Sequence, residues 1–524
     1  MGYGSHGGGS RPHVVTVPFL GQGHLIPFLE LAKLLASQGL IVSYVSTPAN
    51  VARLQPQVDK MVQSSNPALD IRLVSLPLPP IEGLPPGIES SENIPLHMNG
   101  ILMKSSHKLA PQLEQWLELQ MNRSKSDCFP SSPPVCLISD MFTSWVHDSG
   151  AKFGVPTVVF HTSGAFAMSV MHSFIKYTPQ NDVEADDEYF DVPNLSFDFK
   201  LRKSDLPVIF RCAETNPMNN FVREEISRSM EGQGVIFNTF YEMDPLGVDH
   251  IKSLTGRPVW SIGPVLPKNI FDGEGIERVT ADKRGKAADI GEAECLQWLD
   301  SRNPNSVVFV CFGSQSTLNE EQTEALARGL EASQQAFIWA IKLRGHETGL
   351  PEGFEERTKE RGLVIWGWAP QLLILSHPSV GAFLSHCGWN STLESISLGV
   401  PMITWPMFAE QPFTNKFLVN QLQIAEQICS NMDGVADEKV VKRAVIKLLA
   451  EEEGENMRRR AQELRNKAKM AVEEEGSAHA NLHAFLDYMG KLHDKATIKQ
   501  GVKEYDAQYC NGSKRNHTHL PLSA

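Results

Sequence analysis

The sequence predicts a parallel α/β protein with two doubly wound units that face an interdomain cleft. Along most of the chain, short apolar runs alternate with amphipathic helical segments, which is typical of parallel sheets covered by helices. The alternation stops at residues 265–292, which are rich in Gly, Lys, Asp and Glu, and then restarts. Ligands of such sheets bind beyond the carboxyl ends of the strands, so two facing units would form a ligand site between them.

Six apolar runs in the first half of the chain are predicted to be buried strands. Residues 21–39 follow the first run and have the apolar spacing of an amphipathic helix that ends at Gly39. The proline-rich segment 77–87 is predicted to be a loop, because proline cannot continue a helix or a central strand. The predicted strands are residues 13–19, 41–46, 70–76, 135–139, 157–160 and 234–238.

The second half of the chain repeats this pattern. Strands are predicted at residues 306–314, 336–342, 363–368, 380–385 and 400–406, and helices at about 319–335, 454–473 and 477–492. The resulting units are a flexible N-terminus (1–12), an N-terminal domain (13–264), an exposed linker (265–292), a C-terminal domain with closing helices (293–495) and a polar, disordered tail (496–524).

The charge of the chain restricts its partners. It has 48 Lys and Arg against 61 Asp and Glu, a net charge of −13, whereas non-specific binding of nucleic acid or anionic membranes needs a basic surface. The first residues contain no apolar segment typical of a secretory signal, and the charge-free windows 153–175 and 362–393 are interrupted by Pro, His, Gly and Ser. We therefore expect a cytoplasmic protein without stable membrane insertion or a nucleic-acid partner. We also expect it to be a monomer.

The tetrapeptide GQGH at residues 21–24 lies at a predicted strand-to-helix turn, which places His24 at the carboxyl edge of the sheet. An imidazole titrates near neutral pH and can remove a proton from a hydroxyl, so His24 is a candidate general base. The same residue also fits an ordinary polar loop position. A dinucleotide-binding fingerprint is disfavoured, because Ile26 stands at the third glycine position and the strand at 41–46 ends without an acidic residue for a ribose.

Asp140 follows the predicted strand 135–139, and this places it at the same edge of the sheet as His24. A carboxylate there can hold the imidazole in the required tautomer and stabilise the imidazolium, as in hydrolytic triads. The alternative is a helix N-cap, for which Asp is a favoured residue.

Residues 368–411 combine several features of a nucleotide-sugar site. The segment HCGWNS joins the predicted strand 380–385 to a helix that begins near Asn390, and the free N–H groups and dipole at such an N-terminus attract phosphate. Gly388 permits close approach of the backbone, and Trp368 has a flat face on which a base can stack. Polar partners for phosphate, ribose and sugar hydroxyls are available from His386, Asn390, Ser391, Glu394, Glu410 and Gln411, each of which also has an ordinary core, loop or surface interpretation when taken alone.

The 44 residues from Trp368 to Gln411 closely resemble, without a gap, the signature box of plant UDP-dependent glycosyltransferases that act on small molecules. Further agreement comes from GHLIP near the N-terminus, FNTFYEMD at 237–244 and FGSQS at 312–316, so the resemblance spans about residues 13–490. It implies the GT-B fold, in which two Rossmann-like domains face a cleft and the C-terminal domain holds most of the sugar donor.

The resemblance also implies the roles of individual residues. Gln411, at the last box position, usually accompanies glucose, and Thr162 would lie near the sugar or the phosphate. Uracil would stack on Trp368 and bond the Ala369 backbone, and the ribose would be held by Gln371 and Glu394. The diphosphate, which Gly388 allows to approach closely, would be bound by His386, Asn390, Ser391 and Ser314. The hexose would be held by Trp389 (through its backbone), Glu410 and Gln411.

The implied reaction is inverting glucosyl transfer. His24, oriented by Asp140, would deprotonate an acceptor hydroxyl, which would attack the anomeric carbon opposite UDP and give a β-glucoside. The scheme uses UDP-glucose as co-substrate and needs neither a cofactor nor a metal. The acidic stretch 182–191 lies in a predicted polar loop without metal-ligand spacing.

The acceptor would be a small lipophilic molecule, such as a flavonoid, phenolic, terpenoid or hormone. In this family the acceptor pocket includes loops around 77–105 and 165–215, which here contain Phe166, Met171 and Phe174. The same apolar spacing is equally typical of a helix packed on a core. Two alternatives stay open: a catalytically silent nucleotide-sugar binding protein and an NAD(P)-dependent oxidoreductase.

Overall fold

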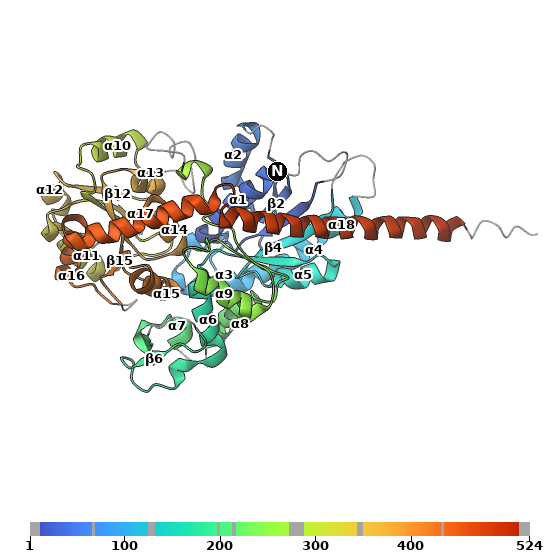
Figure 1. Ribbon diagram of the computed structural model, residues 1–524, viewed down its shortest axis with the longest axis horizontal. Helices are drawn as coiled ribbons and strands as arrows, with labels where there is room; N and C mark the ends of the chain where they lie inside the picture. The colour runs from blue at the N-terminus through green and yellow to red at the C-terminus, as the bar shows by residue number, and fades with distance from the viewer. Residues whose placement is uncertain are drawn as a thin grey trace, which may run out of the picture.

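The computed structural model describes residues 11–64, 69–123, 132–195, 200–211, 216–271, 288–342, 349–430 and 434–512. This part of the chain forms two α/β domains that lie side by side, each built on a parallel sheet with helices packed around it (Figure 1). The predicted fold class is therefore confirmed.

The N-terminal sheet has seven parallel strands in the order β3-β2-β1-β4-β5-β8-β9. The strand order reverses between β1 and β4, which pair from His13 with Pro134 to Val17 with Ser139. The carboxyl ends of the strands open a crevice at such a reversal. The strands are β1 (His13–Val17), β2 (Ile41–Ser46), β3 (Ile71–Ser75), β4 (Pro134–Asp140), β5 (Thr157–His161), β8 (Val235–Phe237) and β9 (Val259–Ser261).

Helices cover both faces of this sheet because its strands are apolar on both sides. Val14 shares one core with Phe28 of α1, and Val15 shares the opposite core with Leu113 of α4, as expected where successive strand residues face opposite ways. The helices of this domain are α1 (Gln22–Ser37), α2 (Pro48–Ser64), α3 (Asn99–Ser106), α4 (Ala110–Arg123), α5 (Trp145–Phe153), α6 (Ala165–Tyr177), α7 (Val208–Arg211), α8 (Pro217–Arg228) and α9 (Pro245–Thr255).

The C-terminal sheet has six strands in the order β12-β11-β10-β13-β14-β15, all of them parallel. Its order reverses between β10 and β13, which gives this domain a crevice of the same kind. The strands are β10 (Val307–Cys311), β11 (Ala336–Ile341), β12 (Gly362–Trp366), β13 (Val380–Ser385), β14 (Met402–Thr404) and β15 (Ala425–Gln427), and the helices are α10 (Glu292–Asp300), α11 (Glu320–Ser333), α12 (Phe354–Thr358), α13 (Gln371–Ser376), α14 (Trp389–Leu398), α15 (Gln411–Lys416), α16 (Glu438–Ala450) and α17 (Glu452–Val472).

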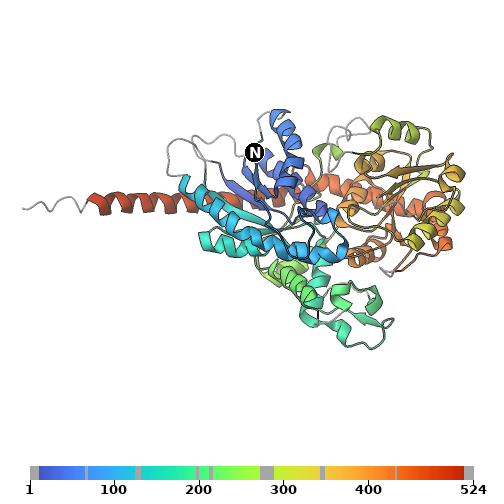
Figure 2. The same ribbon diagram turned by 180° about the vertical axis from the view of Figure 1, so that it is seen from behind.

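The last helix, α18 (Ser477–Gly512), follows the C-terminal domain in sequence but packs on the N-terminal one (Figure 2). Phe485 is buried and meets Trp260 of β9 edge to face at 5.2 Å. The prediction of a disordered tail from residue 496 is wrong as far as Gly512, because α18 continues to that residue. A helix that is already nucleated extends at low cost through a segment free of proline. Residues 513–524 lie outside the described part of the chain.

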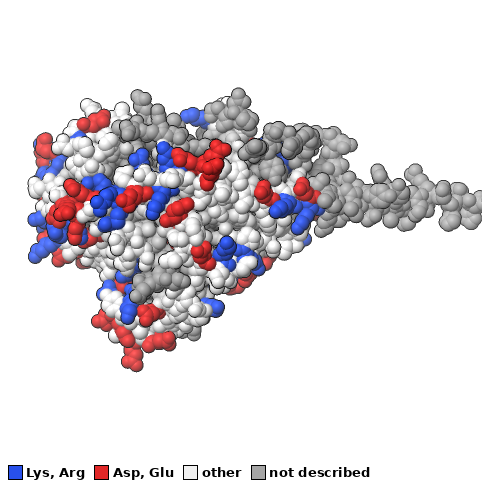
Figure 3. Space-filling model, in the orientation of Figure 1, with Lys and Arg blue, Asp and Glu red and all other residues white. Residues whose placement is uncertain are grey.

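The predicted linker and the acidic stretch also differ in part from expectation. Val265 and Ile270 are only 3% and 5% exposed, so the linker begins in the core, while its residues 272–287 lie outside the described part. The acidic stretch 182–191, predicted to be a loop, ends in a strand, β6 (Tyr189–Asp191), which pairs antiparallel with β7 (Lys200–Arg202). These strands are too short for an alternating pattern to reveal them. Asp and Glu side chains gather around these two strands, at the bottom of Figure 3.

Among the residues that the structure describes, no helix combines the length and the apolar character that crossing a membrane requires.

Candidate active site

His24 and Asp140 meet at the crevice of the N-terminal sheet. His24 lies in the first turn of α1, directly after β1, and Asp140 is the last residue of β4. The His24 Nδ1 atom is 2.7 Å from Asp140 Oδ2, and the backbone N–H of Phe142 donates to Asp140 Oδ1 at 3.0 Å. Because a carboxylate only accepts hydrogen bonds, Nδ1 is the donor and the neutral ring keeps its lone pair on Nε2. The N-cap alternative for Asp140 is wrong, since α5 begins at Trp145 after the N-cap residue Ser144.

Two aromatic rings that the sequence reasoning missed flank the His24 imidazole. The ring of Phe19 meets it edge-on at 5.2 Å between centroids, and the ring of Phe142 lies at 5.5 Å. Both belong to an apolar cluster with Ile94, Leu102 and others. Only their closeness in sequence to GQGH and to Asp140 indicated that these two rings would lie at the site.

The segment Thr162–Gly164 follows β5 and touches three functional positions in succession. The Thr162 hydroxyl lies 3.1 Å from His24 Nδ1, so Thr162 contacts the candidate base in addition to the sugar or phosphate position expected for it. The Ser163 hydroxyl hydrogen-bonds the Glu410 carboxyl. Gly164 packs so closely on the Trp389 ring that a Cβ atom would lie 2.7–3.0 Å from three of its carbons. This segment therefore joins the base to residues of the C-terminal domain.

The crevice of the C-terminal sheet holds His386 between two glycines. A Cβ atom on Gly313 or on Gly388 would lie within 2.6 Å of the His386 ring, so both positions need glycine. Burial lowers the pKa of His386 to about 4, which keeps its ring neutral. Gly388 is the N-cap of α14, and the first N–H groups of a helix have no intrahelical partner.

The predicted ribose-binding residues of α13 and α14 come together. Gln371 Nε2 donates to Ser391 Oγ at 3.1 Å and to Glu394 Oε2 at 2.6 Å. Asn390 follows Trp389 and points toward the other domain, where its side-chain amide donates to the Gly23 carbonyl at 2.7 Å.

Asp289, at the end of the linker, holds the backbone of Trp368 and was not predicted. Its Oδ2 accepts from the Trp368 N–H at 2.6 Å, and its own N–H donates to the Trp368 carbonyl at 2.8 Å. Gly367 makes room for this contact: it has φ +117°, and a Cβ atom there would lie 2.2 Å from Asp289 Oδ2. Ala369, the next residue after Trp368, is buried. No local pattern distinguishes Asp289 from other charges of the linker.

Gln411 is the first residue of α15, and Glu410 is the N-cap of this helix. Burial raises the pKa of the Glu410 carboxyl, and the nearby His24 and the Ser163 hydrogen bond oppose that shift. Gln411 Oε1 accepts from the N–H groups of Met407 and Phe408 at 2.9 and 3.0 Å. These two bonds use both lone pairs of the amide oxygen and fix the orientation of the amide.

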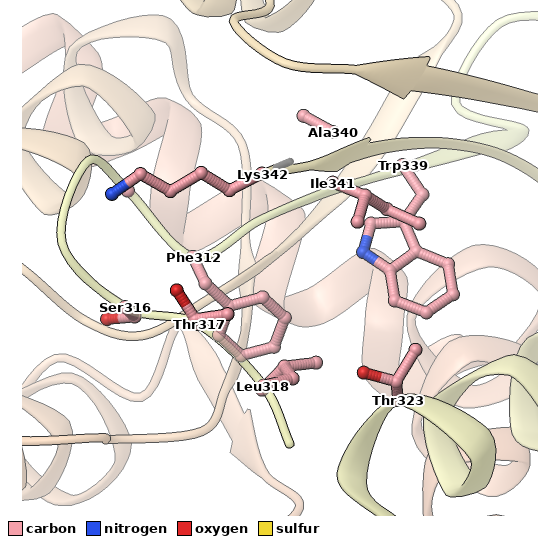
Figure 4. A pocket seen from close by; sticks show the side chains of 10 residues that line it. Phe312, Ser316, Thr317, Leu318, Thr323, Trp339, Ala340, Ile341 and Lys342 are labelled. Carbon is pink, nitrogen blue, oxygen red and sulfur yellow. The ribbon is translucent and has the colours of Figure 1, made fainter. Parts of the chain in front are cut away.

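A hollow of about 540 Å³, open to solvent, lies beside the predicted donor residues (Figure 4). Phe312, Thr317, Leu318 and Trp339 line it together with Lys342, at the carboxyl ends of β10 and β11. It contains none of the residues predicted for the donor, and Ser314 follows Gly313 just beyond its rim.

The α6 residues that were expected to line the acceptor pocket are buried in the core instead. Phe166 and Phe174 are 2% and 1% exposed and pack on the C-terminal domain, against Phe417 at 4.9 Å and Phe413 at 5.7 Å. Met171 belongs to the same core, as does Met168. Core packing is therefore the role of this face of α6.

Comparisons with known proteins define the class. A model described as "Glycosyltransferase, N-terminal domain" matches residues 12–182, and one described as "UDP-glucoronosyl and UDP-glucosyl transferase" matches residues 263–452. The crystal structure of Glycyrrhiza uralensis UGT73P12 complexed with glycyrrhetinic acid 3-O-monoglucuronide superposes with a TM-score of 0.82 at 29% identity, covering 95% of this chain and all of that one. The protein is thus a glycosyltransferase with the GT-B fold.

Curated relatives narrow the class to a family. The scopoletin glucosyltransferase of Nicotiana tabacum is 38% identical over 485 residues, 91% of this chain and 97% of that protein. The anthocyanin 3'-O-beta-glucosyltransferase of Gentiana triflora is 38% identical over 490 residues, 90% of this chain and 97% of that protein. The chain belongs to the plant UDP-glycosyltransferase family. This membership contradicts the oxidoreductase alternative.

Proposed function

We propose that the enzyme transfers glucose from UDP-glucose to a hydroxyl of a small lipophilic acceptor and inverts the anomeric carbon to give a β-glucoside. The observation that carries this proposal is the His24–Asp140 pair. Asp140 and Thr162 both engage Nδ1, and within the described part of the chain Nε2 makes no hydrogen bond. Nε2 is therefore the atom that takes the proton from the acceptor.

Asp140 supports this step in two ways. It keeps the proton of the neutral ring on Nδ1, and it stabilises the imidazolium once Nε2 is protonated. A positioned general base contributes about 10²–10⁴-fold to the rate. The acceptor oxygen then attacks the anomeric carbon from the face opposite UDP, which accounts for inversion.

The leaving UDP is held by the C-terminal domain in this scheme. Trp368 stacks on uracil, the Ala369 backbone bonds its edge, and Gln371 and Glu394 bind the ribose. Negative charge that develops on the diphosphate meets the N-terminus of α14 and neutral donors that are already oriented, which stabilises the transition state. These donors are His386, Asn390, Ser391 and Ser314, and Gly388 allows the phosphates to approach them.

The hexose lies between the two domains, close to Trp389, Glu410 and Gln411. The Gln411 NH₂ group donates to a sugar hydroxyl, because its carbonyl oxygen is already bound by two backbone N–H groups. Glu410 accepts from another hydroxyl. Thr162 sits next to this space but acts first on His24, which its hydroxyl contacts.

The acceptor is proposed to be a flat phenolic molecule. The partly buried Phe142 ring lies beside His24, the buried Phe19 ring packs against the same imidazole, and the cluster around both rings is apolar. The names of the relatives from tobacco and gentian specify scopoletin and anthocyanin, and solved relatives were complexed with pterostilbene and with quercetin. Aromatic walls favour ligands of this kind through stacking and edge contacts.

The test is product formation by the purified protein with UDP-glucose and a panel of scopoletin, quercetin and a terpenoid alcohol. Mass spectrometry identifies the glucoside, and the anomeric proton coupling reports its configuration. The His24→Ala variant is expected to lose at least 100-fold in kcat, taking about the lower bound for a general base. His479→Ala, on α18, is the matched control. A silent nucleotide-sugar binding protein would bind UDP and form no product with any acceptor.

We further propose that the enzyme works in the cytoplasm as a monomer and needs no metal. Both halves of the site belong to one chain, with the base in the N-terminal domain and the donor residues in the C-terminal domain. Sedimentation velocity tests the oligomeric state, and activity in the presence of EDTA tests the metal requirement. A dimer at assay concentration, or loss of activity with EDTA that Mg²⁺ restores, would refute them.

A further inference from the structure

The Trp389 side chain crosses from the C-terminal to the N-terminal domain. Trp389 is the first residue of α14, and its side chain is only 3% exposed. Its indole N–H donates to the Asn238 carbonyl at 2.7 Å, across 151 residues of sequence. Its six-membered ring lies on Gly164, which follows β5. The side chain is therefore fixed by polar and apolar contacts that both come from the other domain.

Asn238 connects this contact to the start of the interdomain linker. Its side-chain Oδ1 accepts from the Val265 N–H at 2.7 Å. Gly263 packs so closely that a Cβ atom there would lie 2.7 Å from Asn238 Oδ1. The indole thus binds the N-terminal domain at the point where the chain leaves it.

The neighbouring residue of α14 reaches the loop that carries the base. Asn390 donates to the carbonyl of Gly23, the residue before His24, while Trp389 lies on Gly164, two residues after Thr162. Since Thr162 contacts His24, the first two residues of α14 contact the residue before the base and the segment that holds Thr162. The N-terminus of α14 is also the proposed diphosphate site.

We propose that the Trp389 side chain is an interdomain positioning residue that sets the distance between the donor held at α14 and the His24 base. This inference rests on the roles proposed above for His24 and α14. It assigns to the indole a function separate from the backbone contact with the hexose. Misplacement of reacting groups by about 1 Å can reduce a rate by about 100-fold, so a small shift of α14 is sufficient to affect turnover.

Two substitutions test the proposal from opposite sides of the contact. Trp389→Phe removes the indole N–H and shortens the ring, and Gly164→Ala inserts a methyl group 2.7–3.0 Å from ring carbons. Trp405→Phe is the matched control: Trp405 is fully buried in the C-terminal domain, and among the described residues its indole nitrogen has no hydrogen-bond partner. Each variant is assayed for kcat with UDP-glucose and scopoletin, and for UDP affinity by calorimetry.

The expected result is a separation of turnover from binding. We expect Trp389→Phe and Gly164→Ala to lower kcat by about 10-fold or more, within the range for misplaced groups, while the UDP dissociation constant stays within about threefold of wild type. Trp405→Phe stays close to wild type in both. A merely structural role would instead reduce UDP binding and thermal stability in parallel with kcat.

The proposal is overturned if Gly164→Ala keeps kcat within twofold, or if UDP affinity falls as much as kcat in both variants. The Gly164 variant decides the question if the Trp389 variant does not fold. Failure of the proposed function is seen separately, because the wild-type protein would then form no glucoside from any acceptor of the panel.

Discussion

Replacing Asp140 by Asn tests the tautomer on which the proposed base depends. Asp140 is completely buried and uses both oxygens, one for the Phe142 N–H and one for His24 Nδ1. In Asp140→Asn the Phe142 N–H still requires an oxygen, so the new NH₂ group must face His24. The NH₂ group then donates to Nδ1, which moves the ring proton to Nε2. Nε2 therefore loses the lone pair that would take the proton from the substrate hydroxyl.

The size of this effect follows from the contribution of a general base. Loss of about 10²–10⁴-fold in kcat corresponds to about 3–5 kcal/mol of transition-state stabilisation. The Asp140→Ala variant leaves the imidazole free to adopt either tautomer, so we expect it to be more active than Asp140→Asn. UDP affinity stays unchanged in both variants, because Asp140 belongs to the N-terminal domain and the donor residues to the C-terminal domain.

The assay is single-turnover glucosyl transfer from UDP-glucose to scopoletin, with calorimetric UDP binding and thermal unfolding as controls. The proposed tautomer is refuted if Asp140→Asn keeps more than one tenth of the wild-type rate constant for transfer. It is also refuted if the Asn variant is more active than the Ala variant while both remain folded.

Three further predictions concern the donor and the fold. Asp289→Ala should raise KM for UDP-glucose about 3–10-fold at unchanged kcat, because a lost hydrogen bond to a charged group is worth about 1.5 kcal/mol or less at an exposed site. Two controls should stay close to wild type: Asp289→Asn, which still accepts from the Trp368 N–H, and the linker variant Glu292→Gln. Gln411→Glu should raise KM for UDP-glucose about 10-fold but leave UDP affinity unchanged, since a carboxylate cannot donate to the hexose; equal KM values would contradict the amide orientation. The free energy of unfolding, measured by urea titration, should fall as the pH is lowered from 6.5 to about 4. Each buried histidine contributes about 1.4 kcal/mol per pH unit, because it stays neutral in the folded protein while the unfolded chain binds a proton. Unchanged stability at pH 5 would contradict this prediction. Burial lowers the pKa of His13, His147, His172 and His386 to about 4 and that of His161 to about 3.

The strands and the two crevices were predictable because their causes are local. Apolar runs such as 135–139 and 380–385 are buried on both faces, and their spacing already indicates parallel strands. Functional residues follow directly after such strands, so His24 and Asp140 could be placed at one edge before any contact was known. The short strands β6, β7 and β15 lack enough residues to show a period.

Contacts between distant parts of the chain were not predictable in the same way. Asp289 meets Trp368 across 79 residues, and nothing in the charged linker marks it. The apolar face of α6 was correctly recognised as apolar, but periodicity does not say whether a ligand or another domain covers it. Phe166 turned out to pack on Phe417. The Trp389 side chain is a similar case, since its partner Asn238 lies in the other domain.

The most direct test of His24 as the base of an inverting transfer is the product formed by the wild-type protein from UDP-glucose and scopoletin, compared with that of His24→Ala. We expect a β-linked glucoside with the wild type and at least about 100-fold slower formation with the variant, while both bind UDP equally. An α-linked product, or equal rates for the two proteins, would contradict the proposed mechanism.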